Sequence, residues 1–508
     1  MVVKKIPQRV WSKQSKAVFK EAKDPNSGHI SVTARAGTGK TTTILEAAEY
    51  MPEASIGFAA FNKRIADEIK TKNKNPRCRV STLHGLGMRL VLSQWPDVTI
   101  PDPVRKRADW LTMQACGGTV PFDVKRMVSK LHTAARERVP HAKNMGDIAD
   151  LIYELEIEPT PQMLDLNYDL EYVESMTLKA MDIAATTRVV EIDFADQIFL
   201  PVRNHWTRKM MDAIIVDERQ DMTGPQLAIA RGVSAGGRML MVGDDRQAIY
   251  GFRGADQEAF ARLARELSAK GLFLTQSYRC GQLIVAEAKR IVPDFEAHPD
   301  NPDGEVLSAS IRDLSTMAAP GDYILSRTNA PLADVAMSLL RLNKPVRVAG
   351  RKFGEGLQAL IVKLRPSDPS DLLAKINGWA DSECDKLLKA EREDRIPAVR
   401  DRAETLITLA TDAVTLEDLD RRIDLLFSDQ VTDDQVIICS SVHRAKGLEA
   451  DRVFILSDTL RADDLEELNI QYVAITRARK TLVYVHGLLN PPKKKKGRRE
   501  NPETAPAL

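Results

Sequence analysis

The sequence is poor in cysteine, in aromatic residues and in long hydrophobic runs. Its five cysteines are scattered over 508 residues, with no metal-binding spacing and no even set for disulfides. This excludes a disulfide-stapled secreted fold and favours a reducing, intracellular setting. No apolar run approaches the roughly 20 residues of a membrane span, and the first residues lack the apolar core of a signal peptide. We therefore expect no membrane association.

An excess of one charge is also missing. Lys and Arg number 73 against 71 Asp and Glu, a net charge of +2. Six positive charges fall within residues 493–499, so the rest of the chain is slightly acidic. Any nucleic-acid groove must therefore be a local concentration of basic residues. The basic run predicts a disordered tail over 489–508, which is either a solvated charge cluster, a tether to nucleic acid, or a nuclear localisation signal in a cell with a nucleus.

What the sequence does contain is two alternations of strand-like and helical stretches, each interrupted by a helical block. Its length predicts two or more domains. Strand-like runs become scarce from about 90 to 190 and again from 355 to 429. The simplest interpretation is an α/β protein with two halves, each carrying a helical insert. The predicted strands are 30–33, 54–61, 80–83, 213–216 and 239–242 in the first alternation, and 272–274, 323–325, 436–439, 452–456 and 481–485 in the second.

Residues 34–43, Ala-Arg-Ala-Gly-Thr-Gly-Lys-Thr-Thr-Thr, stand between a predicted strand and a helical pattern. This arrangement is typical of a phosphate-binding loop, in which glycines let backbone N–H groups face an anion at a helix N-terminus. We expect Lys40 to reach the β- and γ-phosphates of a nucleotide and the Thr41 hydroxyl to bind Mg²⁺. The alternative is an ordinary glycine-rich turn.

Two further predicted strands end in polar residues. Ile214–Val216 is followed by Asp217, which would hold Mg²⁺, and by Glu218, which would orient and deprotonate the attacking water. The alternative is a surface acidic pair. Met239–Val242 leads to Gln247, which is placed to sense a γ-phosphate.

The aromatic residues after Gln247 allow two interpretations. Tyr250 and Phe252 lie beside Gly251 and Arg253. They suit either core packing or stacking on nucleic-acid bases.

Three later segments are specific sequence signals. In chain order they are Gln276-Ser277-Tyr278-Arg279, His443-Arg444-Ala445-Lys446-Gly447-Leu448-Glu449 and Gln471-Tyr472-Val473-Ala474-Ile475-Thr476-Arg477-Ala478. With the phosphate loop and the acidic strand, they resemble the motifs of superfamily 1 helicases of the UvrD/Rep/PcrA type, with similarity to the related F-box DNA helicases. Arg219 and Phe252 depart from the residues common in that family.

The resemblance implies an α/β fold with two RecA-like parallel-sheet motor domains, each with a mainly helical insertion. The implied division is motor domain 1A at 1–89 and 190–256, insert 1B at 90–189, motor domain 2A at 257–354 and 430–488, a short insert 2B at 355–429, and the tail at 489–508.

It also implies ATP and Mg²⁺ as cofactors. The implied catalytic residues are Lys40, Asp217, Glu218, Gln247 and two arginine fingers, Arg279 and Arg477; Thr41 and Asp217 would hold the metal. The implied nucleotide-binding residues are Gln14, which would read adenine, Ala36, Gly37, Thr38, Gly39, Lys40, Thr41, Thr42, Tyr278, which would stack on adenine, and Glu449 at the ribose.

The implied track is single-stranded DNA and its junctions with duplex. Expected contacts are Phe61, Asn62, Lys63, Thr82, His84, Tyr250, Phe252, Arg253 and His443. The expected function is an ATP-dependent helicase moving 3′-to-5′. The alternatives are a translocase that strips bound proteins with little unwinding, and an ATP-gated DNA-binding scaffold; an RNA track is disfavoured. We expect it in the cytoplasm at the nucleoid, or in the nucleus of a eukaryotic host.

Overall fold

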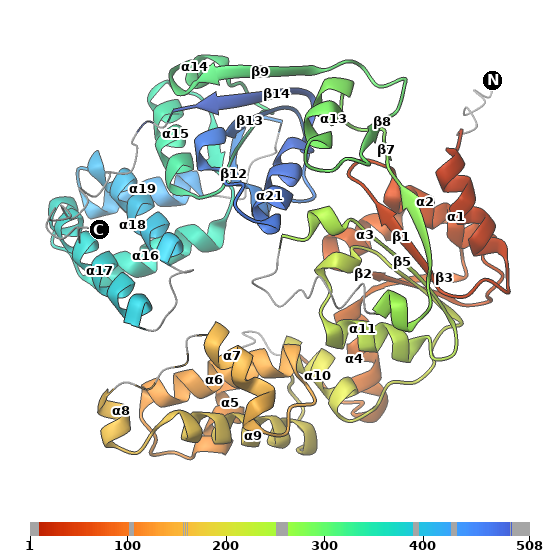
Figure 1. The fold of residues 1–508 in the computed structure, drawn as a ribbon. Coiled ribbons are helices and arrows are strands. Elements are labelled where there is room, and N and C mark those ends of the chain that lie inside the picture. Colours follow the sequence, from red (N-terminus) through yellow and green to blue (C-terminus); the bar gives the residue numbers. More distant parts are fainter. Residues whose placement is uncertain are drawn as a thin grey trace, which may run out of the picture. The chain divides into compact units, whose positions relative to one another are not determined.

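The computed structural model describes residues 10–100, 106–155, 157, 159, 161–249, 263–389, 396–427, 434–487 and 489 (Figure 1). By packing, the chain divides into two compact units. Unit 1 comprises residues 1–304, 386–393 and 461–480, and unit 2 comprises residues 305–385, 394–460 and 481–508.

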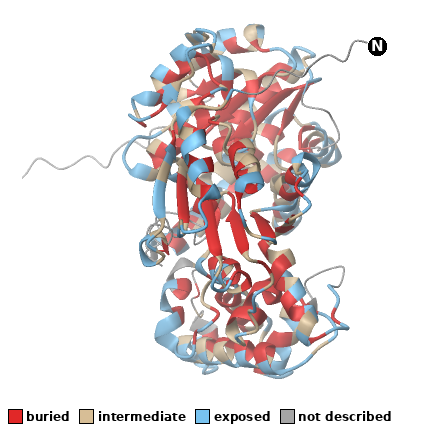
Figure 2. Ribbon diagram, turned by 90° about the vertical axis from the view of Figure 1, so that its right-hand side faces the viewer, coloured by how far each residue is buried: buried red, intermediate tan, exposed pale blue. Residues whose placement is uncertain are grey.

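Unit 1 contains a six-stranded sheet in the order β3-β2-β4-β5-β1-β6, and all five neighbouring pairs are parallel. Its strands are β1 (Ile30–Ala34), β2 (Ile56–Ala60), β3 (Cys78–Thr82), β4 (Ala213–Val216), β5 (Arg238–Gly243) and β6 (Lys270–Leu274). The central strands are continuous apolar runs because helices cover both faces of a parallel sheet. Figure 2 shows these strands as buried, and every residue of β4 and β5 is buried.

The helices of this sheet are α1 (Lys13–Lys23), α2 (Lys40–Tyr50), α3 (Lys63–Lys72), α4 (Leu83–Gln94), α10 (Phe194–Arg203) and α11 (Gly224–Val233). Unit 1 also holds a two-stranded sheet of β7 (Gln276–Ser277) and β8 (Glu296–Ala297), with α13 (Gln282–Lys289) between them, and the late helix α21 (Leu465–Ile475). Because the carboxyl ends of parallel strands lie at one edge of a sheet, the loops after β1, β4 and β5 meet there.

A helical insert lies between α4 and α10. It consists of α5 (Lys106–Cys116), α6 (Phe122–Arg138), α7 (Ala149–Glu154), α8 (Pro161–Asp165) and α9 (Leu170–Thr186). The two segments that connect it pair with each other: Thr99 N donates to Val190 O at 2.8 Å, and Ile192 N donates to Thr99 O at 3.0 Å. Its apolar core continues into α4 and α10, so the insert packs firmly on the rest of unit 1.

Unit 2 has its own six-stranded sheet in the order β11-β12-β10-β13-β14-β9. Its strands are β9 (Glu305–Ser310), β10 (Tyr323–Ser326), β11 (Val346–Val348), β12 (Ile437–Ser441), β13 (Ala450–Leu456) and β14 (Ala478–His486). Its helices are α14 (Ile311–Met317), α15 (Ala330–Arg341), α16 (Arg351–Leu364), α17 (Pro369–Lys389), α18 (Ile396–Thr411), α19 (Leu416–Leu426) and α20 (Val442–Ala445). Residues of α16 to α19 share one apolar core with this sheet.

The predicted α/β class is confirmed, and all ten predicted strands form within a few residues of their expected bounds. Residues 272–274 were expected in the second alternation, but β6 pairs with β1 at the edge of the first sheet. The polar strand β9 gave no apolar signal, because all of its residues are exposed or half-buried.

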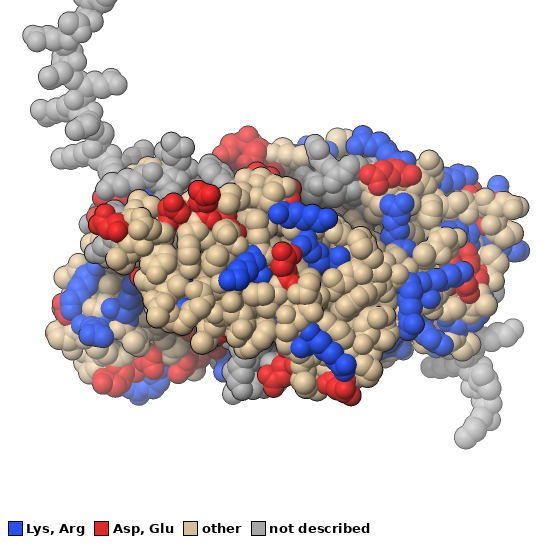
Figure 3. Space-filling view, turned by 90° about the horizontal axis from the view of Figure 1, so that it is seen from below, with Lys and Arg blue, Asp and Glu red and all other residues tan. Residues whose placement is uncertain are grey.

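Within the described ranges, every helix is too short or too polar to cross a lipid bilayer. On the face drawn in Figure 3, basic and acidic side chains are interspersed among uncharged residues. This matches the balanced charge of the sequence.

Candidate functional site

The loop between β1 and α2 has the backbone of an anion-binding turn. Gly37 and Gly39 have φ values of 69° and 76°, which glycine adopts without strain. A Cβ at Gly37 would lie 2.5 Å from Arg279 Cβ, so the loop also needs glycine for close packing. Thr38 closes the turn by donating its hydroxyl to Arg35 O at 2.8 Å. Thr41 and Thr42 follow in the first turn of α2.

Lys40, the first residue of α2, lies against the two carboxylates that follow β4. Its Nζ is 3.4 Å from Asp217 Oδ1 and forms a close ion pair with Glu218 Oε1. Burial lowers the pKa of Lys40, but Asp217 and Glu218 more than offset this, so its pKa is raised and it stays charged. Burial raises the pKa of Asp217, with Lys40 acting in the opposite direction. The three residues predicted to act on a triphosphate are thus assembled at one edge of the sheet.

Glu218 sits in a strained turn. It is a non-glycine residue with φ of 54°, a conformation that clusters at functional sites. Gln220 Nε2 donates to Glu218 Oε2 at 2.6 Å, and Gln220 Oε1 accepts from Asp244 N at 3.1 Å. Gln220 therefore ties the Glu218 carboxylate to the loop that follows β5.

That loop carries the buried Asp244, which binds several partners. Arg35 Nη1 donates to Asp244 Oδ1 at 2.9 Å, and Gln247 Nε2 donates to Asp244 Oδ2 at 2.8 Å. Burial raises the pKa of Asp244, and Arg35 opposes the rise. Arg35 also binds Asp294 with two nitrogens, at 3.1 and 3.0 Å. The predicted γ-phosphate sensor Gln247 is thereby held, through Asp244, by Arg35 of the phosphate loop.

Helix α21 reaches the same network through Tyr472, which is fully buried. The Tyr472 hydroxyl accepts from Ala36 N at 3.0 Å and donates to Asp244 Oδ2 at 3.2 Å. Burial, followed by the nearby Asp244, raises the pKa of Tyr472 well above its usual value. Asn469 of the same helix donates to Ala248 O at 3.3 Å. A segment near the end of the chain is thus docked on the phosphate loop.

The two predicted arginine fingers have different surroundings. Arg279 follows β7 beside Gly37, and Tyr278 N donates to Gly37 O at 2.9 Å. Arg477 is fully buried just after α21 and donates from Nε to Val473 O at 2.9 Å. Arg279 is therefore next to the loop, whereas the guanidinium of Arg477 binds the end of its own helix.

The predicted adenine-binding residues lie close to the segment of Arg279. Gln14 exchanges two hydrogen bonds with Thr275: Nε2 donates to Oγ1 at 2.8 Å, and Oε1 accepts from the backbone N at 2.9 Å. Tyr278 is 44% exposed, and its ring lies 4.7 Å from that of His298. An exposed tyrosine supported by a histidine suits stacking, whereas the amide of Gln14 is engaged by the protein.

The chemistry of two oxygen donors suits a magnesium ion. The Thr41 hydroxyl and the Asp217 carboxylate are hard oxygen ligands of the kind that Mg²⁺ takes together with water and phosphate oxygens. No cluster of three or more His, Cys, Asp or Glu able to hold a metal occurs among the described residues.

Four of the predicted DNA contacts lie at the carboxyl ends of β2 and β3, which pair in register from Ile56 to Ala60. Asn62 caps α3 by accepting from Ile65 N at 2.9 Å, and Thr82 caps α4 by accepting from Gly85 N at 3.0 Å. Lys63 is exposed and Phe61 half-buried beside them. The caps give Asn62 and Thr82 structural roles that exist without DNA.

His84 has an exposed aromatic neighbour that the sequence did not indicate. The ring of Phe194, the first residue of α10, lies 6.4 Å from that of His84 and is 52% exposed. Burial lowers the pKa of His84, which keeps it neutral at physiological pH. The sequence signal that could have identified Phe194 is its position. It is an apolar residue directly after the capping Asp193, at the start of a helix, where a solvent-exposed polar side chain is expected.

The other predicted contacts are placed differently. Tyr250, Phe252 and Arg253 lie outside the described residues. His443 lies in α20 of unit 2, directly after β12, and Glu449 immediately precedes β13.

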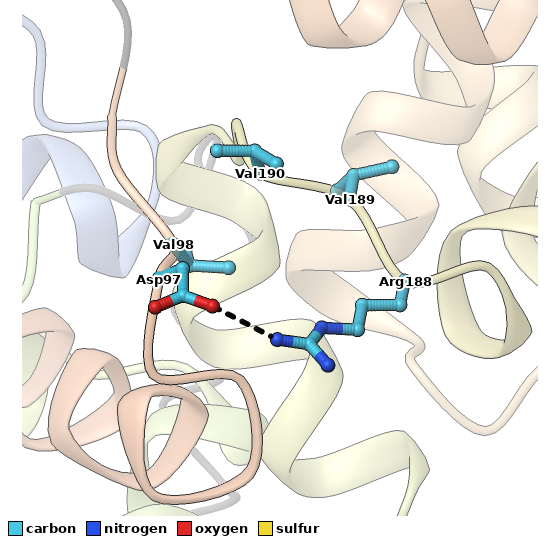
Figure 4. A pocket seen from close by; sticks show the side chains of 5 residues that line it. All are labelled: Asp97, Val98, Arg188, Val189 and Val190. Carbon is cyan, nitrogen blue, oxygen red and sulfur yellow. Dashed lines mark hydrogen bonds and ion pairs between the residues drawn. The ribbon is translucent and has the colours of Figure 1, made fainter.

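A separate surface pocket of about 260 Å³ lies where the insert joins the rest of unit 1 (Figure 4). It is lined by Asp97, Val98, Arg188, Val189 and Val190. Asp97 and Arg188 form an ion pair at 3.2 Å with side chains 80% and 59% exposed, and pairs this solvated contribute little. The pocket belongs to the connection of the insert and not to the cluster around Lys40.

The chain is similar to known proteins over most of its length. Residues 13–268 match the UvrD/REP helicase N-terminal domain, and residues 437–485 match the UvrD-like helicase C-terminal domain. The chain is 26% identical over 511 residues to F-box DNA helicase protein 1 of Schizosaccharomyces pombe, covering 90% of this chain and 56% of that protein. It is 23% identical to DNA helicase II of Escherichia coli, covering 65% and 51%, and 26% identical to ATP-dependent DNA helicase UvrD2 of Mycobacterium tuberculosis, covering 89% and 75%. The chain spans about half the length of the first two.

Proposed function

Because the chain belongs to the UvrD/REP helicase family, we propose that it is an ATP-dependent DNA helicase that moves 3′-to-5′ along single-stranded DNA and unwinds duplex. The observation that carries the proposal is the contact of Lys40 with both Asp217 and Glu218, inside a network that also holds Gln247. A glycine-rich turn without nucleotide chemistry needs no such convergence of charged residues.

In this proposal the phosphate loop binds ATP. Residues 36–42 would surround the phosphates, with Lys40 leaving its carboxylate partners to contact the β- and γ-phosphates. Thr41 and Asp217 would hold Mg²⁺, which neutralises phosphate charge. Tyr278 would stack on the adenine, Gln14 would lie near the base, and Glu449 would bind the ribose.

Turnover would rest on a base and on cationic groups at the γ-phosphate. Glu218 accepts a proton from the attacking water, and Gln247 reports the state of the γ-phosphate. Arg279 and Arg477 supply positive charge to the transition state, an effect of about 10³–10⁵ in rate for an arginine finger. Loss of the γ-phosphate removes the anion that these groups share, and this coupling would drive movement along DNA.

The DNA track would begin at the carboxyl ends of β2 and β3. Asn62, Lys63, Thr82 and His84 provide polar and charged groups for the backbone, together with Arg253 and His443. Phe61, Phe194, Tyr250 and Phe252 are the candidates for base stacking, worth about 1–3 kcal/mol per base. We propose single-stranded DNA and its junctions as the partner, and the cytoplasmic nucleoid, or the nucleus of a eukaryotic host, as its location.

Duplexes with a 3′ or a 5′ single-stranded tail test the proposal. We expect ATP-dependent unwinding of the 3′-tailed duplex only. Unwinding of the 5′-tailed duplex alone would reverse the polarity. A translocase of low unwinding power would displace a protein bound to single-stranded DNA without separating strands.

ATP hydrolysis separates the motor from a DNA-binding scaffold. We expect hydrolysis to be weak alone and to rise strongly with single-stranded DNA. Lys40→Ala should abolish it, whereas Glu218→Gln should bind ATP and not turn it over. Wild-type hydrolysis that no DNA stimulates would reject the motor function.

A further inference from the structure

Arg219 is a buried arginine directly after the proposed base Glu218. Its side chain is 5% exposed. Its Nη1 donates to Ser31 Oγ at 2.6 Å, and its Nη2 donates to Thr33 Oγ1 at 2.9 Å. Ser31 and Thr33 lie on one face of β1, the strand that leads into the phosphate loop. One side chain thus links the turn of Glu218 to the strand that leads into the loop before Lys40.

The route of this side chain crosses a neighbouring strand. The sheet order is β4-β5-β1, and Arg219 follows β4, so its side chain passes over the end of β5. The residue there is Gly243, where a Cβ would lie 2.5 Å from Arg219 Cγ and 2.2 Å from Gln220 Oε1. Two strand spacings amount to about 10 Å between backbones. The long arginine side chain, its hydrogen bonds and the hydroxyl groups of Ser31 and Thr33 together bridge this distance, which a short side chain at 219 would leave open.

The placement of Arg219 is electrostatically costly. Burial lowers the pKa of Arg219 to about 10, with Asp245 and Asp244 acting in the opposite direction. It therefore stays charged at neutral pH, where its guanidinium donates to the hydroxyls of Ser31 and Thr33. The cost of burying this charge points to a role in geometry.

We propose that Arg219 is a positioning residue that anchors the Glu218 turn to β1 and so sets the orientation of the Glu218 carboxylate toward the bound nucleotide. This inference rests on the proposed ATPase function. Gln220 holds the Glu218 carboxylate, and Arg219 anchors the backbone of the same strained turn to β1.

Arg219→Met is the central test, because methionine keeps an unbranched stem over Gly243 and removes the guanidinium. We expect the kcat of DNA-stimulated ATP hydrolysis to fall about 10- to 100-fold, the effect of a small misplacement of a reacting group. The KM for ATP and the Kd of a fluorescent ATP analogue should change less than about twofold, since uniform binding is retained. Arg219→Lys, which keeps the charge, should recover part of the rate.

Arg238→Met is the matched control. Arg238 is 8% exposed and is the first residue of β5, the strand whose last residue, Gly243, lies against the Arg219 side chain. It donates to Ala22 O at 2.6 Å and to Asp24 O at 2.7 Å. Its loss should lower thermal stability and leave kcat unchanged. Equal effects of Arg219→Met and Arg238→Met on kcat would reduce Arg219 to a stabilising residue and overturn the proposal.

Removing the acceptors gives a second route if Arg219→Met does not fold. Ser31→Ala and the double variant Ser31→Ala/Thr33→Val should lower kcat in steps, with the KM for ATP unchanged. Full wild-type kcat in the folded double variant would also overturn the proposal. If the wild-type protein binds ATP but DNA does not stimulate hydrolysis, the result rejects the proposed function itself and not the role of Arg219 within it.

Discussion

A single hydroxyl connects three distant parts of the nucleotide site. Tyr472 O–H accepts from the phosphate loop at Ala36 and donates to Asp244 in the loop after β5. All three groups are buried, so none can exchange its partner for bulk water. An unpaired buried donor or acceptor costs more than a hydrogen bond gains, which makes this hydroxyl a sensitive position.

We expect Tyr472→Phe to destabilise the protein by about 1–3 kcal/mol. The variant keeps the ring and its edge-to-face contact with Phe295 at 5.6 Å, and it leaves Asp244 and Ala36 short of one partner each. Urea unfolding measures the loss. Tyr50→Phe is the control, because the Tyr50 hydroxyl binds Glu46 at an exposed site; an equal loss in both variants would contradict the argument.

His132 makes stability depend on pH. Burial, followed by the nearby Arg136, lowers the pKa of His132 to about 3. The unfolded chain binds a proton below about pH 6.5 that the folded protein excludes, so stability is full above that pH and falls as pH decreases toward 3. Between pH 7 and pH 5 this residue should cost about 2 kcal/mol.

Urea midpoints at the two pH values measure this dependence. His132→Gln should remove that part of the pH dependence. His486→Gln, at an exposed histidine, should retain it. A wild-type slope in His132→Gln would contradict the prediction.

How far the sequence predicts the site depends on how local each signal is. Lys40, Asp217 and Glu218 each follow an apolar strand, and the rule that loops meet at one sheet edge brings them together. Arg35 and Tyr472 carry no such signal, since their partners lie 209 and 436 residues away in the chain. The amide of Gln14 likewise binds Thr275, 261 residues away, where a base contact was expected from resemblance alone.

At the scale of elements, a buried ionic cluster joins the helical insert to α10. Arg136 of α6 binds Asp193 at 2.7 Å and Asp196 at 2.6 Å, and Arg107 of α5 binds Asp196 at 2.8 Å. Asp193 also caps α10 by accepting from Asp196 N at 2.9 Å. The cluster thereby fixes the first turn of α10, where Phe194 faces solvent.

We expect Arg136→Met to cost about 3–5 kcal/mol, since it removes the cation that binds the buried Asp193 and leaves Asp196 with Arg107. It should also weaken single-stranded DNA binding by releasing the start of α10, while hydrolysis without DNA is retained. Denaturant unfolding and fluorescence anisotropy with labelled DNA measure the two effects. Arg188→Met, which breaks the exposed pair with Asp97, should change stability by less than about 0.5 kcal/mol.

The elements themselves were largely predictable, because apolar strands and amphipathic helices have distinct periods. The helical block expected between about 90 and 190 forms as α5 to α9. Sheet membership was harder, as β6 shows: its pairing with β1 spans some 240 residues, and no local pattern encodes it. The polar edge strand β9 was not predicted, because it has no buried residues and so shows no apolar pattern in the sequence.

At the scale of the whole molecule, charge is balanced except in the basic run at 493–499. This run lies outside the described residues. If it tethers DNA, removing residues 490–508 should reduce the salt dependence of single-stranded DNA binding. Six charges correspond to a slope change of at most about 4 in log K against log salt. Binding titrations at several salt concentrations measure the slope, and an unchanged slope would identify the run as a solvated charge cluster.

The passage of Arg219 over Gly243 has a consequence for sequence divergence among relatives of this chain. Any side chain at position 243 would collide with the stem of Arg219 and with Oε1 of Gln220, so position 243 can gain a Cβ only after both neighbours have changed. Related proteins that retain a long basic residue at 219 should therefore carry glycine at 243.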